Sequence, residues 1–268
     1  MDATITDQEF ALFQRLIYRI AGISMSSAKK ILLVGRLSKR LKHYGFTSFS
    51  EYYRLLASGA PGDELQTFVD LLTTNETYFF REPQHFEYLR DSILPARRTS
   101  NPLRIWSGAC SSGEEPYTIA MVLAANLPNT SWEIFASDIS LAVLARAQDG
   151  IYPLERAHGI PPEYLRRYCM KGVRSQEGKL LVRPDLRQRV RFGQVNLTGP
   201  ITGIGEFDVI FLRNVMIYFD AETKTKVVEN MLPSLKPGGY FIVGHSESLN
   251  GITDRLRSLR PTVYQKPQ

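Results

Sequence analysis

The segment LRIWSGACSSGEEPYTIAMVLAANL (103–127) runs from a short apolar stretch through a loop of small residues into a stretch of helical period. Further short apolar runs follow it, separated mainly by helical stretches: EIFASDI (133–139), VRFGQVNL (190–197), FDVIFLRN (207–214) and GGYFIVGH (238–245). Strands that alternate with helices are typical of an open parallel sheet with right-handed crossovers and helices on both faces. The sequence after about residue 100 therefore predicts a doubly wound α/β domain.

One segment does not fit this alternation. Residues 151–189 stand where a single crossover is expected, and GKLLVRPDLRQRVRF (178–192) resembles a strand pair that turns at Pro184 and Asp185. We therefore predict a small antiparallel β insertion at 151–189.

The chain before about residue 95 shows helical periodicity without sustained strand-like alternation. In TDQEF (6–10), Thr6 and Glu9 have the spacing of a capping box, which indicates a helix start. AKKILLVGRLSKRLKHYGF (28–46) places leucines on one stripe, and Gly45 is a typical helix stop. We predict an all-helical domain at 1–82 and a second domain at 83–268 that contains the sheet.

Composition excludes several classes of protein. The 268 residues include two cysteines and four histidines, without the spacings of a zinc site or a disulfide framework, so we expect no metal site. The start MDATITDQEF is not a signal peptide, and no apolar run is long enough for a membrane span, which predicts a cytoplasmic protein without membrane insertion. The net charge of +6 indicates an anionic partner: nucleic acid, a membrane surface or an acidic protein.

The loops after the first two strands predict a cofactor site, because ligands of open α/β sheets bind beyond the carboxyl ends of the strands. SGACSSGEEP (107–116) lacks both GxGxxG and GxxxxGK[ST], and Glu114 and Glu115 would repel phosphates but favour a cation. Asp138 stands where an acid commonly holds ribose hydroxyls. An adenosine-type ligand with positive charge and no phosphate, such as S-adenosylmethionine, fits this pattern. As alternatives, Asp138 caps the next helix and the two glutamates only complement a helix dipole.

Several motifs together resemble the CheR family, the chemotaxis receptor glutamate methyltransferases: TTNETYFFRE (73–82), RIWSGACSSGEEPYTIA (104–120), FASDIS (135–140), VNL (195–197), FLRNVMIYF (211–219) and LKPGGYFIVGHSE (235–247). The resemblance implies the S-adenosylmethionine-dependent methyltransferase (Rossmann-like) fold with a helical N-terminal domain and a β insertion. It implies a monomeric protein-glutamate O-methyltransferase that acts on chemoreceptors and yields methyl esters and S-adenosylhomocysteine.

The resemblance also assigns site residues. It places a set of residues at the cofactor: Asn75, Thr77, Arg81, Glu115, Asp138, Asn196, Leu197, Leu212, Arg213 and Asn214. It makes Arg81 and Tyr218 the catalytic residues, as a clamp and an orienting hydroxyl for the substrate carboxylate. The alternatives are a surface ion pair of Arg81 with Glu76 or Glu82 and a core position for Tyr218. A glutamate is ionised at pH 7, with a pKa near ~4.3, so methyl transfer to it needs alignment more than a general base.

The helix predicted at 28–46 carries six Lys or Arg between positions 29 and 42 and no acid. The resemblance suggests that Lys29, Arg36, Lys39 and Arg40 dock on the cytoplasmic methylation helices of chemoreceptors, although a solvated helix face would have the same pattern. It also suggests that the β insertion binds a receptor C-terminal peptide as an added strand, with Arg183 and Arg187 nearby.

Two other functions compete with this interpretation. An RNA methyltransferase would fit the basic composition, but the chain has RNVMIY (213–218) in place of an NPPY-type loop, and Cys110 lies only in the first loop. We therefore expect no nucleic-acid partner. A non-catalytic adaptor would bind the cofactor without methyl transfer. The presence of Arg81 and Tyr218 argues against this alternative.

Overall fold

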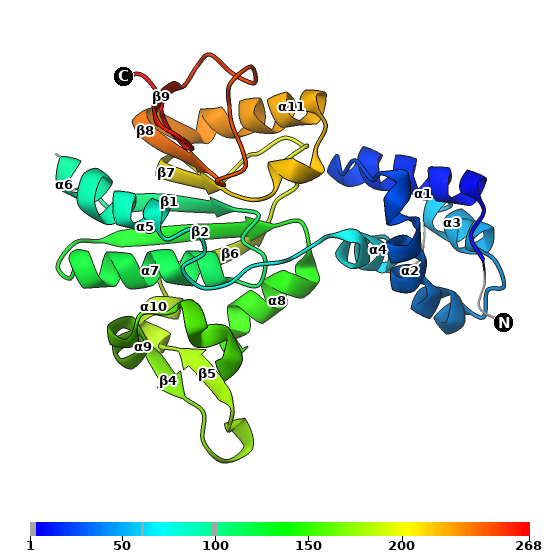
Figure 1. The fold of residues 1–268 in the computed structure, drawn as a ribbon, viewed down its shortest axis with the longest axis horizontal. Coiled ribbons are helices and arrows are strands. Elements are labelled where there is room, and N and C mark those ends of the chain that lie inside the picture. The colour runs from blue at the N-terminus through cyan, green and yellow to red at the C-terminus, as the bar shows by residue number, and fades with distance from the viewer. Residues whose placement is uncertain (1–3, 60–61, 98–100) are drawn as a thin grey trace.

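The computed structural model describes residues 4–59, 62–97 and 101–268 (Figure 1). The first part is a bundle of four helices: α1 (Asp7–Ala21), α2 (Lys30–Tyr44), α3 (Phe49–Ala57) and α4 (Glu64–Leu72). Thr6 and Glu9 form the predicted capping box, and Gly45 ends α2 in a left-handed conformation. In the described part of the chain, no helix is long and apolar enough to cross a membrane.

A seven-stranded sheet forms the second part, in the order β6-β2-β1-β7-β8-β10-β9. Five strands are parallel: β1 (Leu103–Gly108), β2 (Trp132–Asp138), β6 (Val190–Gln194), β7 (Phe207–Leu212) and β8 (Leu235–Val243). Two further strands, β9 (Arg257–Arg260) and β10 (Val263–Gln265), add an antiparallel edge. The strand order reverses between β1 and β7, which is where ligands bind in doubly wound sheets.

Helices cover both faces of this sheet, because alternate strand residues point to opposite sides. Trp106, Ile210 and Phe241 are in register and pack in one buried cluster with residues of α11 (Ala221–Met231). The next residues along β7 and β8, Phe211 and Ile242, belong to a second cluster with residues of α7 (Glu114–Asn126). The second cluster also includes residues of α5 (Gln84–Tyr88) and of the π-helical turn Leu89–Ile93, which continues into α6 (Leu94–Ala96).

The predicted β insertion is present after α8 (Leu141–Asp149), but its predicted turn is wrong. Its three antiparallel strands have the order β3-β5-β4: β3 (Ile151–Pro153), β4 (Cys169–Lys171) and β5 (Lys179–Val182). Pro184 and Asp185 begin the short helix α10 (Pro184–Arg187), because a proline suits the first turn of a helix. The turn lies at 172–178 instead, and the helix α9 (Pro162–Tyr168) precedes β4.

The helical domain lies at one end of the sheet (Figure 1), and direct contacts hold it there. The carboxylate of Asp70 in α4 accepts from the backbone N–H groups of Leu141 and Ala142 at the start of α8, at 3.0 and 3.3 Å. An anion at a helix N-terminus is electrostatically favourable. Gly22, after α1, permits a second contact, since a Cβ there would lie 2.6 Å from the Thr223 methyl carbon.

Glu64 is a buried carboxylate in the core of the helical domain, only 4% exposed. Arg40 donates to both of its oxygens, and the Tyr52 and Tyr44 hydroxyls donate at 2.7 and 2.9 Å. Burial raises the pKa of Glu64, but these hydrogen bonds outweigh it and hold the pKa below its ordinary value. Arg40 is therefore part of the folded core of this domain.

We predict that Glu64→Gln lowers the free energy of unfolding by about 2–4 kcal/mol at pH 7, because it leaves a partly buried guanidinium without its counter-ion. A carboxylate with a lowered pKa contributes stability above its ordinary pKa near ~4.3, and this stability is lost as the pH falls. The difference from wild type should therefore shrink toward pH 3 in urea titrations. Glu155→Gln, at an exposed position, is the control. Equal effects of the two substitutions at pH 7 would contradict this account.

Candidate active site

A pocket lies between the helical domain and the carboxyl ends of the strands. The linker between α4 and α5 comprises residues 73–83. Short segments from both domains line the pocket: Ala21 and 23–25 at the end of α1, Leu72 with 73–78 and Arg81 of the linker, 109–111 after β1, 138–139 at the end of β2, 195–197 after β6, and 213–215 with 218–219 after β7. Lys29, Leu32, Phe86 and Glu115 complete its lining. The pocket thus occupies the position predicted from the strand ends.

The loop after β1 is held in a strained backbone conformation beside this pocket. Ala109 and Ser111 have φ angles of 57° and 50°, in the left-handed region that non-glycine residues avoid. The backbone N–H of Ser111 donates to the Asp138 carboxylate at 2.9 Å, and its hydroxyl donates to the Asn75 carbonyl at 3.0 Å. Strain of this kind persists where surrounding contacts enforce it, often at functional sites.

Arg213, directly after β7, is the central charge of the site, and its side chain is 1% exposed. It donates to Glu115 of α7 at 2.8 Å, to Glu82 of the linker at 3.0 Å, and to the Arg81 carbonyl. Burial raises the pKa of Glu82, but hydrogen bonds from Asn214 and Arg213 outweigh it and leave the pKa lowered. One guanidinium therefore joins three segments that are distant in the sequence.

Two carboxylates orient the turn after β7, and the sequence analysis assigned a role to neither. Glu247 accepts from the backbone N–H groups of Asn214, Met216 and Gly244 at 2.7–2.8 Å. Glu82 accepts from the Asn214 side chain at 2.9 Å and from the backbone N–H of His245 at 3.1 Å. The available signal was that both acids end a family motif, TTNETYFFRE (73–82) and LKPGGYFIVGHSE (235–247). These contacts hold Asn214 at a positive φ of 58°.

Asp138 ends β2 as a buried carboxylate that lines the pocket. Burial raises its pKa, although backbone N–H groups of Ser140 and Ser111 donate to it, each at 2.9 Å. The N-cap of α8 is Ser140, whose hydroxyl accepts from Val143, so Asp138 is not the cap. Its position is compatible with contact to a ligand in the pocket.

Arg81 and Tyr218 both line the pocket, from the linker and from the turn after β7. Arg81 donates to the backbone carbonyl of Glu76 at 2.8 Å, and its guanidinium carbon lies 5.7 Å from the Tyr78 ring centroid. Its predicted alternative partners, the carboxylates of Glu76 and Glu82, are not its hydrogen-bond acceptors. The Tyr218 backbone carbonyl accepts from Ser24 at 2.8 Å, which attaches this turn to the helical domain.

Of the other predicted cofactor residues, all but Leu212 line the pocket. Asn75, Thr77, Asn196 and Leu197 line it, and the Asn196 amide also donates to the Ile20 carbonyl at 2.6 Å. Leu212 does not line the pocket, because its side chain points from β7 into a buried core cluster. The pocket is reached instead by Arg213 and Asn214, which follow the strand end.

The basic residues of α2 separate into two groups. Arg40 is paired with Glu64, and Arg36 donates to the Thr73 carbonyl at 2.9 Å, where burial lowers its pKa. Lys29 and Lys39 are exposed, and Lys29 also lines the pocket. Arg36 and Arg40, which were expected to dock on a partner, are therefore engaged within the protein. The acid that balances Arg40 lies on α4 rather than within α2.

The chemistry of the pocket lining fits S-adenosylmethionine. Two acids, Glu115 and Asp138, line the pocket, as suits a cationic ligand with ribose hydroxyls, and the loop after β1 lacks a phosphate-binding motif. Cys110 also lines the pocket, but burial raises its pKa well above the ordinary value, so its thiol is not a ready nucleophile. Fold and site define an S-adenosylmethionine-dependent methyltransferase.

Comparison with known proteins identifies the family. The model of the CheR methyltransferase SAM binding domain matches residues 75–265, and that of the CheR methyltransferase all-alpha domain matches residues 8–73. The chain belongs to the CheR methyltransferase family. It is 43% identical over 263 residues to the chemotaxis protein methyltransferase of Escherichia coli K12, covering 97% of this chain and 91% of that protein.

A second curated relative agrees with this assignment. Chemotaxis protein methyltransferase 2 of Pseudomonas aeruginosa is 43% identical over 97% of this chain and 93% of its own length. Among solved structures, the N-methyltransferase NodS of Bradyrhizobium japonicum, in complex with S-adenosyl-L-homocysteine, has a TM-score of 0.43 and 13% identity, over 74% of this chain and 95% of that chain.

We predict that Arg213→Met lowers the free energy of unfolding by about 3–5 kcal/mol, because it leaves Glu82 and Glu115 without their shared cation. Urea titration at pH 7 measures the loss. Arg90→Met is the matched control: Arg90 pairs with Asp91 on the surface, and an exposed pair contributes at most about 1 kcal/mol. A loss for Arg213→Met no larger than that of the control would show that the cluster does not hold these segments together.

Proposed function

We propose that this chain transfers the methyl group of S-adenosylmethionine to glutamate side chains of methyl-accepting chemotaxis receptors, with S-adenosylhomocysteine as the product. The observation that carries the proposal is the pocket: it lies at the strand ends of a methyltransferase fold and is lined by Arg81 and Tyr218. The names of the curated relatives, chemotaxis protein methyltransferases, indicate the same class of substrate.

In this proposal, the pocket lining divides between cofactor and substrate. Glu115 faces the cationic methionine portion and Asp138 the ribose, while Asn196 and Leu197 flank the adenine. Asn75 and Thr77 close the site from the linker. Arg213 contributes through position: its two terminal nitrogens already donate to Glu115, to Glu82 and to the Arg81 carbonyl, whereas its buried Nε has no partner. Its contacts instead set the geometry of Arg81 and Asn214.

The bound cofactor supplies an electrophilic methyl group on a sulfonium, which an ionised carboxylate can attack in line without a general base. Arg81 supplies the positional clamp, because its present acceptor is a neutral carbonyl and a charged carboxylate is a stronger partner for a guanidinium. The Tyr218 hydroxyl orients the same carboxylate. Well-oriented reactants gain about 7–11 kcal/mol relative to free encounter, which makes alignment the main contribution of these residues.

Partner recognition extends the proposal to the surface. We assign residues 1–82 as a receptor-docking domain and 83–268 as the catalytic domain, and we place the monomeric protein in the cytoplasm, where receptor methylation helices lie. The predicted docking cations that remain exposed are Lys29, directly before α2, and Lys39 within it. The edge strand β4, with the half-exposed Met170, is the proposed position for a receptor C-terminal peptide.

Two substitutions separate binding from alignment. We predict that Arg81→Ala lowers kcat for a receptor fragment about 10²-fold or more with the cofactor Kd nearly unchanged. Asp138→Asn, which keeps an acceptor oxygen for a backbone N–H, should raise the cofactor Kd about tenfold with a smaller effect on kcat. Calorimetry with S-adenosylhomocysteine gives Kd, and labelled methyl transfer gives kcat. The reverse pattern, a Kd effect for Arg81→Ala and a kcat effect for Asp138→Asn, would refute these roles.

A charge reversal tests docking. We predict that Lys39→Glu slows methylation of a receptor fragment about 2- to 5-fold at low salt, since one exposed charge contact is worth up to about 1 kcal/mol. The effect should fade at high salt because exposed charges are screened. Lys226→Glu, an equal charge change on the exposed side of α11, is the control. Equal slowing by both variants would exclude a specific docking face on α2.

A further inference from the structure

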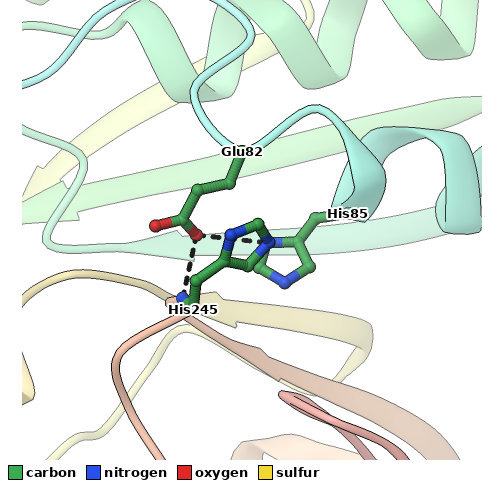
Figure 2. A group of neighbouring side chains, drawn as sticks. All are labelled: Glu82, His85 and His245. Carbon is green, nitrogen blue, oxygen red and sulfur yellow. Dashed lines mark hydrogen bonds and ion pairs between the residues drawn. The ribbon is translucent and has the colours of Figure 1, made fainter.

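Three potential metal ligands meet beside the active site: Glu82, His85 and His245 (Figure 2). Glu82 and His85 are three residues apart, at the end of the linker and in α5, whereas His245 comes from the turn after β8 and is brought to them only by the fold. One carboxylate oxygen and one nitrogen of each ring all lie within 4.8 Å of one another. The rings of His85 and His245 meet edge to face, with centroids 4.8 Å apart.

His85 presents an unpaired nitrogen to this cluster. Its ring is 3% exposed, and its Nε2 lies 2.8 Å from the Thr262 hydroxyl. That hydroxyl also lies 2.7 Å from the Pro261 carbonyl; when it donates there, it accepts from an Nε2–H of His85. Nδ1 then carries a lone pair and has no hydrogen-bond partner. A buried acceptor without a donor is costly, so the site favours an added cation.

The Glu82 carboxylate also favours a cation beside His85. Its Oε2 lies 3.5 Å from His85 Nδ1, so a carboxylate and an imidazole lone pair face each other with no donor between them. Arg213 does not neutralise the region alone, because Glu82 and Glu115 share it and Glu247 adds a third carboxylate nearby. Arg260, over the Tyr88 ring, is a second cation near His85. Both guanidiniums oppose a further cation at His85, so the attraction of the cluster for an ion rests on the Glu82 carboxylate and the two imidazoles.

We propose that Glu82 Oε2, His85 Nδ1 and the His245 imidazole bind a divalent transition-metal ion of the zinc type. Two imidazoles and one carboxylate are the donor set that zinc and its neighbours prefer, whereas magnesium and calcium prefer oxygen ligands. The hydrogen bond of His85 Nε2 to Thr262 orients the ring as the outer partner of a metal-bound histidine does. His245 is exposed, which gives the ion an entry path and the ring freedom to turn toward it.

Such an ion would connect the linker to the turn after β8. Glu82 already accepts from Arg213, from Asn214 and from the backbone N–H of His245, so a metal on its Oε2 would add a fourth connection. A ligand that binds only the folded chain stabilises it against unfolding. Metal binding should therefore raise the melting temperature whether or not the chain is turning over.

The test is a metal titration of the untagged chain, with Co²⁺ absorption as the spectroscopic probe and Zn²⁺ calorimetry for stoichiometry. We expect one ion per chain, the visible bands of four- or five-coordinate cobalt, and a higher melting temperature with Zn²⁺. His245→Ala should weaken binding at least tenfold and abolish the thermal shift. Because His245 is exposed, this variant should keep the fold, which far-UV circular dichroism checks.

His158→Ala, at an exposed histidine outside the cluster, is the matched control and should bind as wild type does. The proposal is overturned if neither ion binds at tens of micromolar, or if His245→Ala binds as tightly as wild type. It is equally overturned if His158→Ala loses binding to the same extent as His245→Ala. None of these outcomes depends on methyl transfer, so they leave the proposed function to its own tests.

Discussion

The buried guanidinium of Arg213 is the interaction on which the rest of the site depends. It connects Glu115 at the start of α7, Glu82 of the linker and the end of β7, and each of these segments contributes residues to the pocket lining. A buried charge of this kind is tolerated only with its partners in place, so the linker cannot leave the sheet without a large cost. Glu82 and Asn214, both with positive φ angles, belong to this cluster, which indicates that its contacts enforce one local geometry.

Features that depend on residues close together in the sequence were predicted, whereas features that depend on residues distant in the sequence were not. Helix caps, strand positions and the strand-end site depend on neighbouring residues and on the rule for open sheets, and the sequence predicted them: Thr6, Gly45 and the loop at 107–116 are examples. The pairing of Arg40 with Glu64 and the roles of Glu82 and Glu247 depend on residues brought together only by the fold. The turn of the β insertion was misplaced because a Pro-Asp pair suits a helix start as well as a hairpin.

The structure also changes the interpretation of the positive net charge. A net charge of +6, with six basic residues in one helix, suggested a continuous docking face. Three of those residues have internal partners: Lys30 pairs with Asp7, Arg36 with the Thr73 carbonyl and Arg40 with Glu64. The proposed docking on an acidic receptor surface would therefore rest on the exposed Lys29 and Lys39, whereas Arg36 and Arg40 are engaged within the protein. Catalysis by alignment is consistent with this, because the fold positions the reacting groups and no acid-base pair is required.

The central claim is that the transferred methyl group becomes a glutamate ester on a receptor. The direct measurement is incubation of the chain with methyl-labelled S-adenosylmethionine and a receptor cytoplasmic fragment, with an RNA sample in parallel. The account predicts label on the receptor fragment that mild base releases as methanol, loss of label when the acceptor glutamates are replaced by alanine, and none on RNA. Base-stable label, label on RNA, or no turnover with a chain that binds the cofactor would contradict it.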